Sequence, residues 1–552
     1  MSNPNSKVAR MVQPEALKRD EFLPWSRGRG VDVWAMLCAA ITGDLEVIHR
    51  LVARDPTLVN CEYQYLTPIR FAVRENQRAV VDFLLQHGVD PAYEAGDSLV
   101  QLARDRGYTE LEAFLQSKLK ERYQIVPEGA TIAAAIKAYE PAKVRRLLDQ
   151  QPNLVHTADE RGNQPIHWAV MTRQTELIDY LLHKGADINA RRPDGARPLD
   201  LTNGDYHYRG WRDLPATAPQ RHEVLIGYLL ARGAQYDISV AAKVGDLKRV
   251  RELLDEDPSL VNRLPSYDGY YSGLPLRCAA AAGHLQVVKL LLDLGANPNE
   301  PEPGIAPHGG ALHAAIGGKH FEIAKLLLER GANPNAAVES SGNCFSMGKW
   351  VGAPKEFLDV LASYGAALTV ELVCHDGDVQ TLAQMLHANP RLSLEGALGA
   401  ALGHPQCMEL ILRYQRELLR SPIPYETAWW DLGSPKGADF ARWLMESGLD
   451  PNRGNWLGVT LLHRCAAKGS IEVAAVCLEF GADINTMDTD ASSTPLGWAA
   501  REGKTEMVRW LLHNGANPDL PLDEEWARPL AWATRRGHSA VTEELKQHLS
   551  SH

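Results

Sequence analysis

Similar segments recur about every 33 residues along this chain, and this recurrence constrains the fold more than any other feature of the sequence. The segment "TPIRFAVRENQRAVVDFLLQHGVDP" (67–91) aligns with "QPIHWAVMTRQTELIDYLLHKGADIN" (164–189). Four more copies begin at residues 274, 310, 460 and 494. A single copy is too small to bury its own apolar surface, so the copies must stack into a solenoid. The 552 residues are therefore expected to form one long array of repeats.

Each copy predicts two helices joined by a short turn. In the copy at 274–299, Cys278 and the four alanines after it form a first helix with almost no side-chain bulk. Gly283 is expected to end that helix, and residues 287–292 supply the apolar stripe of a second, longer helix. Gly295 then ends the second helix, because glycine adopts the left-handed conformation at no steric cost.

The repeated motif resembles the ankyrin repeat, whose Thr-Pro-Leu-His-x-Ala signature is nearly reproduced at 67–72, 164–169 and 460–466. The resemblance covers nearly the whole chain from about residue 31 to 549, with about sixteen helix pairs, several of them degenerate. It implies an all-α fold, an ankyrin-repeat solenoid of stacked antiparallel helix pairs. Hairpin loops, called fingers, would project beside a concave surface called the palm.

The histidine position of the motif is filled by His167, His313 and His463 in three copies. In the family this histidine holds loops in place within the scaffold. The resemblance therefore implies a structural role for these three side chains.

Departures from the pattern suggest how the array is divided. A variant with Pro-x-Leu in place of Gly-Ala-x-x-Asn recurs, as in "DPTLVN" (55–60) and "NPRLSL" (389–394). At 233–247 and 365–379 one repeat passes into the next with no room for a finger. We predict an N-terminal tail and cap over 1–30 and four blocks of repeats: 31–128, 129–236 with an inserted loop at 206–220, 237–367, and 368–552 with a C-terminal cap.

Composition narrows the environment and the partners. The eight cysteines show no paired spacing, which suits a reducing compartment. The net charge of −11 argues against a groove for nucleic acid, which would need a basic stripe. The N-terminus lacks the apolar core of a signal peptide, and no run is long enough to span a membrane. We expect a cytoplasmic protein with neither nucleic acid nor membrane as partner.

The sequence contains none of the common catalytic or metal-binding motifs. It has no phosphate-binding glycine loop, no Gly-x-Ser-x-Gly turn and no His-Glu-x-x-His pair. The nearest approach to a metal site is Cys374 and His375 with His404 and Cys407, but this spacing matches no structural zinc pattern. We expect these residues to serve packing, and we predict no metal and no cofactor.

Aromatic and arginine side chains outside the core positions are the candidates for a binding surface. Tyrosine and tryptophan offer a large contact area with few torsions to freeze, although packing within the hairpins is an equally good explanation for those on fingers. The arginines lie at or near the palm and could contact an acidic partner. The candidates are Tyr63, Tyr65, Tyr267, Tyr270, Tyr271, Trp429, Trp430 and Trp456, together with Arg70, Arg74 and Arg277.

One insertion, "TNGDYHYRGWRDLPATAPQRHE" (202–223), adds about fifteen residues between the two helices of one repeat. Neighbouring repeats stack without such a loop, so its aromatics must cover either the scaffold or a ligand. We favour a second wall that narrows the palm. Its candidate binding residues are Tyr206, Tyr208, Arg209 and Trp211.

The leading interpretation is a non-catalytic scaffold that binds a protein or peptide on its concave face, as the resemblance implies. The alternative is a protein that binds a small molecule or glycan, or an enzyme, with its site where the 206–220 loop approaches the 266–273 finger. A purely structural spacer is least favoured because the insertions are not uniform. If the site were catalytic, the candidates for proton transfer would be Asp205, His207, Asp268, His308 and His313.

Overall fold

The computed structural model of the chain is an array of short antiparallel helix pairs, so the predicted all-α solenoid is confirmed. The described residues contain a single two-stranded ribbon, β1 (Ala337–Val338) with β2 (Gly342–Asn343). The structure describes residues 8–23, 26–92, 97–123, 127–205, 208–210, 212–219, 221–265, 267, 273–302, 305–338, 341–394, 396–401, 404–420 and 435–551.

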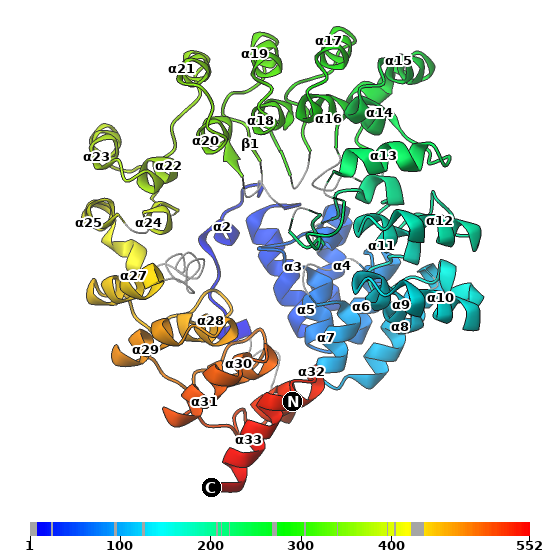
Figure 1. The fold of residues 1–552 in the computed structure, drawn as a ribbon. Coiled ribbons are helices and arrows are strands. Elements are labelled where there is room, and N and C mark those ends of the chain that lie inside the picture. The colour runs from blue at the N-terminus through cyan, green and yellow to red at the C-terminus, as the bar shows by residue number, and fades with distance from the viewer. Residues whose placement is uncertain are drawn as a thin grey trace.

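The N-terminal half of the array includes a long connection between η3 and α13 (Figure 1). Its elements are α2 (Glu15–Lys18), α3 (Gly30–Thr42), α4 (Leu45–Arg54), η1 (Pro56–Asn60), α5 (Pro68–Arg74), α6 (Arg78–Gln86), α7 (Leu99–Asp105), α8 (Thr109–Tyr123), α9 (Pro127–Lys137), α10 (Pro141–Gln150), η2 (Pro152–His156), α11 (Pro165–Met171), α12 (Thr175–His183), η3 (Pro198–Leu201) and α13 (His222–Leu230).

The central part of the array is the most regular, and its first helices stack directly on one another in the order α14, α16, α18, α20. Its elements are α14 (Ile238–Val244), α15 (Leu247–Glu256), η4 (Pro258–Asn262), α16 (Pro275–Ala282), α17 (Leu285–Asp293), α18 (Ala311–Gly317), α19 (Phe321–Glu329), α20 (Cys344–Trp350) and α21 (Lys355–Ser363).

The C-terminal part returns towards the beginning of the chain. Its elements are α22 (Val370–His375), α23 (Val379–Ala388), α24 (Ala397–Ala400), α25 (Pro405–Tyr414), η5 (Arg416–Arg420), α27 (Pro435–Glu446), α28 (Leu461–Lys468), α29 (Ile471–Glu479), α30 (Pro495–Arg501), α31 (Thr505–His513), η7 (Glu525–Ala527), α32 (Pro529–Arg536) and α33 (Ser539–Ser551).

Helix ends in the regular repeats follow the sequence closely. Gly283 caps α16 at φ +82° and Gly295 follows α17 at φ +94°, as the repeat pattern predicts. The Pro-x-Leu variant forms a short 3₁₀ helix, as in η1, where the side chain of Asp55 accepts a hydrogen bond from the amide of Thr57 at 2.9 Å. The copy at 389–394 is an exception, because it forms only a turn.

The three motif histidines hold neighbouring loops in place, as the resemblance implies. His167 accepts a hydrogen bond from the amide of Gln164 on Nδ1 at 3.1 Å, so Nε2 carries the proton and donates to the carbonyl of Ala190 at 3.1 Å. Burial lowers the pKa of His167 to about 3, which keeps the ring neutral. His463 bonds the carbonyl of Ser493 at 3.1 Å, and His313 that of Ser341 at 3.3 Å.

The buried apolar side chains form four clusters. The first covers 11–119 and includes Ala158, and the next three cover 132–240, 238–361 and 370–545. The first cluster also contains Trp456, Leu457 and Val459, which come from the far end of the sequence. This exception shows that the two ends of the array share a core. The block boundaries proposed from the sequence stay a prediction.

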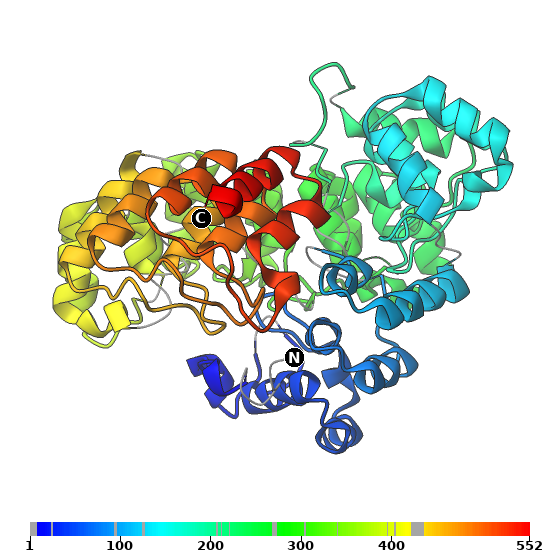
Figure 2. The ribbon, with the colours of Figure 1, turned by 90° about the horizontal axis from the view of Figure 1, so that it is seen from below.

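The array curves so strongly that its ends meet. In Figure 1 the helices from α9 to α31 sweep round in a wide arc, and α32 comes to lie beside α7. Figure 2 shows the blue N-terminal helices beneath the orange and red C-terminal repeats. We call the contact between these ends the closing interface.

Candidate binding surfaces

A cleft of about 510 Å³ lies between two successive fingers and the end of α8. The fingers are residues 157–163, between η2 and α11, and residues 187–196, between α12 and η3. We call it the finger cleft. Its lining residues are Arg122, Tyr123, His156, Ala158, Gly162, Gln164, Asp187, Ala190, Arg191 and Pro193.

The first finger is held rigid by one buried carboxylate. Asp159 accepts hydrogen bonds from the amide of Asn163 at 2.9 Å and from the indole of Trp168 at 2.6 Å. Gly162 lies against the second finger at φ +78°, and a Cβ there would meet Pro193 at 2.2 Å. The two fingers are therefore in close contact, and only a glycine fits at their crossing point.

The second finger is tied to the first by Arg192, which is buried. Its guanidinium donates to the side chain of Asn163 at 2.9 Å and to the carboxylate of Asp205 at 2.5 Å. It also pairs with Asp194. These bonds fix the backbone on which the cleft residues stand, so the cleft is formed before any ligand arrives.

The cleft presents charged and polar side chains to solvent. Arg122, His156, Asp187 and Arg191 are exposed, and they surround the half-buried ring of Tyr123. Burial, with the charge of Asp90, raises the pKa of Tyr123 to about 12, so its hydroxyl stays protonated. Such a lining suits the side chains and backbone of a polypeptide, because small-molecule pockets are mostly apolar.

The insertion is anchored by a buried arginine from the preceding repeat. Arg173 donates to the carbonyls of Thr202 at 3.3 Å and Pro219 at 2.9 Å, and to the side chain of Asn203 at 2.9 Å. One guanidinium thus holds both ends of the loop between η3 and α13. The loop lies between the two helices of one repeat, as the sequence predicts, but no feature of the sequence marks Arg173 as its anchor.

Tyr208, a predicted binding residue of the insertion, packs inward. Its ring meets Trp168 edge to face at 5.5 Å between centroids, and its hydroxyl donates to the carbonyl of Asp213 at 3.3 Å. Arg209 is half-buried, and its amide donates to the side chain of Asp213 at 2.7 Å. The insertion therefore covers the scaffold at Tyr208. Tyr206, His207 and Trp211 lie outside the described residues.

The described candidates for proton transfer have separate surroundings. Asp205 is buried in the ion pair with Arg192 and accepts from the amide of Tyr208 at 2.9 Å. His313 is the loop-holding histidine described above, and burial lowers its pKa to about 4. His308 is exposed. Asp268 lies outside the described residues.

The finger candidate Tyr267 and the palm candidate Arg277 are both engaged with the scaffold. The ring of Tyr267 lies 5.9 Å from the guanidinium carbon of Arg192. Arg277 donates to the buried carboxylate of Glu302 at 2.8 Å. The candidates Tyr270, Tyr271, Trp429 and Trp430 lie outside the described residues.

The remaining candidates meet at the closing interface, where Trp456 is the central apolar group. Its side chain is only 1% exposed. Its indole lies edge to face against Trp34, Tyr63 and Phe71, with centroid distances of 6.3, 5.6 and 5.9 Å. Its Nε1 donates to the side chain of Gln64 at 2.9 Å. Tyr65 is next to this contact and is 39% exposed.

The predicted palm arginines Arg70 and Arg74 face a carboxylate of the same chain. Each has a terminal nitrogen 3.6 Å from Asp490, on the loop before α30. Arg106 donates to the carbonyl of Asp490 at 2.7 Å. Burial opposes ionisation of Asp490, but Arg70, Arg74, Arg106 and Arg501 outweigh it and lower the pKa of that carboxyl.

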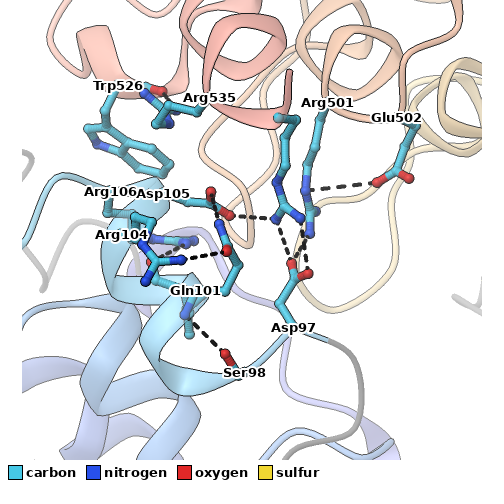
Figure 3. A network of polar contacts seen from close by, with 12 residues as sticks. Asp97, Ser98, Gln101, Arg104, Asp105, Arg106, Arg501, Glu502, Trp526 and Arg535 are labelled. Carbon is cyan, nitrogen blue, oxygen red and sulfur yellow. Dashed lines mark hydrogen bonds and ion pairs between the residues drawn. The ribbon is translucent and has the colours of Figure 1, made fainter. Parts of the chain in front are cut away.

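In a second group of ion pairs, drawn in Figure 3, the acidic side chains come from the N-terminal repeats and the arginines from the C-terminal repeats. Asp97, just before α7, accepts from Arg501 at 2.5 Å and from Arg536 at 2.8 Å. Arg536 also pairs with Asp105. Burial would raise the pKa of Asp97, but Arg536 and Arg501 lower it to about 2. No motif in the sequence marks these residues.

Comparison with known proteins identifies the repeat. The profile of the family described as "Ankyrin repeats (3 copies)" matches residues 99–192, 238–338 and 432–522, slightly more than half of the chain. The chain belongs to the ankyrin-repeat family. The count of about sixteen ankyrin repeats stays a prediction.

Several curated proteins resemble parts of this ankyrin array. Alpha-latrocrustotoxin-Lt1a of Latrodectus tredecimguttatus is 27% identical over 28% of this chain and 9% of its own length. Palmitoyltransferase ZDHHC13 of Mus musculus is 32% identical over 24% of this chain and 22% of its own. Palmitoyltransferase ZDHHC17 of Rattus norvegicus is 38% identical over 14% of this chain and 13% of its own. The chain thus matches less than a quarter of each of these relatives, and these matches carry no evidence of catalysis.

None of the described helices is both long and apolar enough to cross a bilayer. Over the same residues, no three histidine, cysteine or acidic side chains are grouped as a metal ion would require.

Proposed function

We propose that this ankyrin-repeat protein is a non-catalytic scaffold that holds a protein or peptide partner on the concave, finger-bearing side of its array. Ankyrin repeats in general mediate protein interactions, and the chain belongs to that family. The observation that carries the proposal is the finger cleft, whose two fingers are cross-linked through Arg192 and present exposed charged side chains.

The volume and lining of the cleft favour a polypeptide. About 510 Å³ holds a few side chains of a peptide. Arg122 and Arg191 can donate to carboxylates or backbone carbonyls, and Asp187 can accept from backbone amides. A partner that lies across the fingers would extend over the neighbouring repeats and bury the roughly 800 Å² per side that a stable complex needs.

The catalytic alternative has less support. Asp205 and His313, two of its candidates for proton transfer, take part in contacts that hold the scaffold together. Tyr208, expected on the wall of a small-molecule site, packs on Trp168.

The test is affinity capture from a native lysate with the full-length chain, followed by protein and small-molecule mass spectrometry. The recovered protein is then titrated against wild type and against the double variant Arg122→Ala/Arg191→Ala. We expect the affinity to fall by tenfold or more, about 1.4 kcal/mol, because both guanidiniums contact the partner.

The matched control is Arg251→Ala/Lys289→Ala, which removes two exposed cations from α15 and α17. It should bind as tightly as wild type. An unchanged affinity of the Arg122/Arg191 variant would move the partner away from the finger cleft. Recovery of a stoichiometric small molecule and no protein would overturn the scaffold proposal itself.

A further inference from the structure

The closing interface joins residues that are far apart in the sequence. The hydrogen bond from Trp456 to Gln64 spans 392 positions, and that from Arg536 to Asp97 spans 439. We call the two sides the N-terminal face and the C-terminal face. The N-terminal face comprises Trp34, Tyr63, Gln64, Arg70, Phe71, Arg74, Asp97, Asp105 and Arg106, and the C-terminal face comprises Trp456, Asp490, Arg501, Trp526 and Arg536.

Each face carries both positive and negative side chains. Opposite charges meet across the interface only when the two faces are aligned as they are in the structure. The N-terminal face offers arginines to Asp490 at one place and carboxylates to Arg501 and Arg536 at another. Between these groups, Arg106 stacks on Trp526 with its guanidinium carbon 4.7 Å from the ring centroid. Complementary charge of this kind gives an interface its specificity and its rate of association.

The interface has an apolar part, where Trp456 is buried against the N-terminal repeats, and a polar part that resembles a docking contact between folded parts. The ion pairs of Arg70 and Arg74 with Asp490 are 3.6 Å long, and both terminal nitrogens of Arg74 lack a hydrogen-bond partner. The Nε atoms of Arg501 and Arg536 also lack one. Buried charges with incomplete hydrogen bonding cost free energy that the ion pairs only partly offset. Contacts of this polar kind allow relative motion of the parts they join.

The two faces stand on repeats that have neighbours of their own. In a repeat array each repeat is stabilised by the repeats next to it, so neither end depends on the closing interface to fold. The helices α5 and α7 pack on each other, and α30 packs on α28 and α32. Both faces therefore persist when the interface opens.

We propose that the closing interface also acts between molecules: the C-terminal face of one chain docks on the N-terminal face of a second copy whenever that face is not occupied by its own chain. The partner that binds the N-terminal face is thus the C-terminal face of another copy, which offers the same indole, aspartate and two arginines that make the contact within one chain. If two copies exchange their ends, the contact forms twice and the assembly is closed as a dimer.

Complementary variants of the full-length chain test this proposal. The first variant, Asp97→Arg/Arg106→Ala, damages only the N-terminal face. The second, Trp456→Ala/Asp490→Asn, damages only the C-terminal face. Each variant weakens closure within one molecule, whereas a mixture retains one intact face of each kind.

We expect each variant alone to be a monomer with a larger radius of gyration than wild type in small-angle X-ray scattering. An equimolar mixture should elute as a heterodimer in size-exclusion chromatography with light scattering, at concentrations above a micromolar Kd. The matched control replaces the second variant by Trp350→Ala/Asp255→Asn, which changes two exposed residues. That chain stays closed, so it should not capture the first variant.

A mixture that stays monomeric would overturn the proposal, and so would a heterodimer with the control chain, because its N-terminal face is occupied. If circular dichroism shows that a variant does not fold, the pair Asp97→Arg and Arg501→Asp/Arg536→Asp replaces it. These side chains are 20–22% exposed, so their reversal leaves the cores intact. The same outcomes decide that experiment: a heterodimer supports the proposal, whereas a monomeric mixture or a heterodimer with the control chain overturns it.

Discussion

Replacing Trp456 by alanine should remove much of the free energy that holds the two ends of the array together. The side chain is 1% exposed and makes three edge-to-face contacts, each of about 0.5–1.5 kcal/mol. Its hydrogen bond to Gln64 adds about 1 kcal/mol. The sum agrees with the about 3–5 kcal/mol that tryptophan-to-alanine changes cost in well-packed sites.

The residues at which protection from hydrogen exchange is lost distinguish opening of the interface from unfolding of a repeat. Among the described residues, the aromatic partners of Trp456 belong to the N-terminal repeats, so the contact between the ends bears the cost. Hydrogen exchange followed by mass spectrometry should show faster exchange at 63–66 and 455–459, where isolated backbone bridges flank the indole. The central helices α16–α19 should exchange as in wild type.

Two further variants calibrate this result. Trp456→Phe keeps an aromatic ring but loses the hydrogen bond to Gln64, so it should cost about 1–2 kcal/mol. Trp350→Ala removes a side chain that is 77% exposed, and it should change stability by less than about 0.5 kcal/mol. Faster exchange throughout the chain, or unchanged exchange at 63–66, would refute the assignment of Trp456 to the closing interface.

Other consequences can be measured separately. Leu291→Ala should cost about 2–5 kcal/mol. Protection from hydrogen exchange should weaken around 274–335 and change little beyond 458, because each repeat contacts only its neighbours. A uniform loss of protection would contradict the solenoid. Tyr208→Ala should cost about 2 kcal/mol in urea titrations, because it removes the ring that packs on Trp168. Tyr208→Phe keeps that ring and loses only the hydroxyl contacts to Asp213 and Tyr139, so it should cost less than about 1 kcal/mol. Equal effects would contradict the contact with Trp168. The pKa of Asp97 is lowered from 3.8 to about 2, so its contribution of about 2 kcal/mol is complete above about pH 5 and is lost as the pH falls through about 2. The stability difference between wild type and Asp97→Asn should shrink over that range. Seven of the eight cysteines are buried and Cys38 is half-buried, and burial raises the pKa of Cys38 to about 12; thiol reagents should label the native protein slowly and the urea-unfolded protein rapidly.

Local features of the repeats could be predicted from the sequence because they depend on a few consecutive residues. The helix ends at Gly283 and Gly295 follow from the conformational freedom of glycine. The 3₁₀ turn at 56–60 follows from a capping aspartate and a proline. In each case the residue that sets the local backbone conformation belongs to the same repeat as the helix end or turn that it forms.

The closing interface could not be predicted in the same way. The motif tells which positions of a repeat face the palm, but it does not tell what lies opposite. That depends on small rotations accumulated over the whole array. The sequence therefore predicts that Arg70 and Arg74 contact an acidic partner, whereas in the structure they face Asp490 of the same chain. The finger cleft was missed for a related reason, because its residues come from two fingers and the end of α8.

The distance between Gln64 and Trp456 along the chain has a consequence for synthesis. A ribosome adds about 5–20 residues each second, so the 392 residues between them take about 20–80 s to make. During that time the N-terminal repeats can fold, but the rings of Trp34, Tyr63 and Phe71, which form the socket for the indole of Trp456, stay exposed to water. Chaperones, or the end of a chain finished earlier on the same messenger, can meet that socket first. The order in which the two faces leave the ribosome thus gives other molecules access to the N-terminal face before the chain can close on itself.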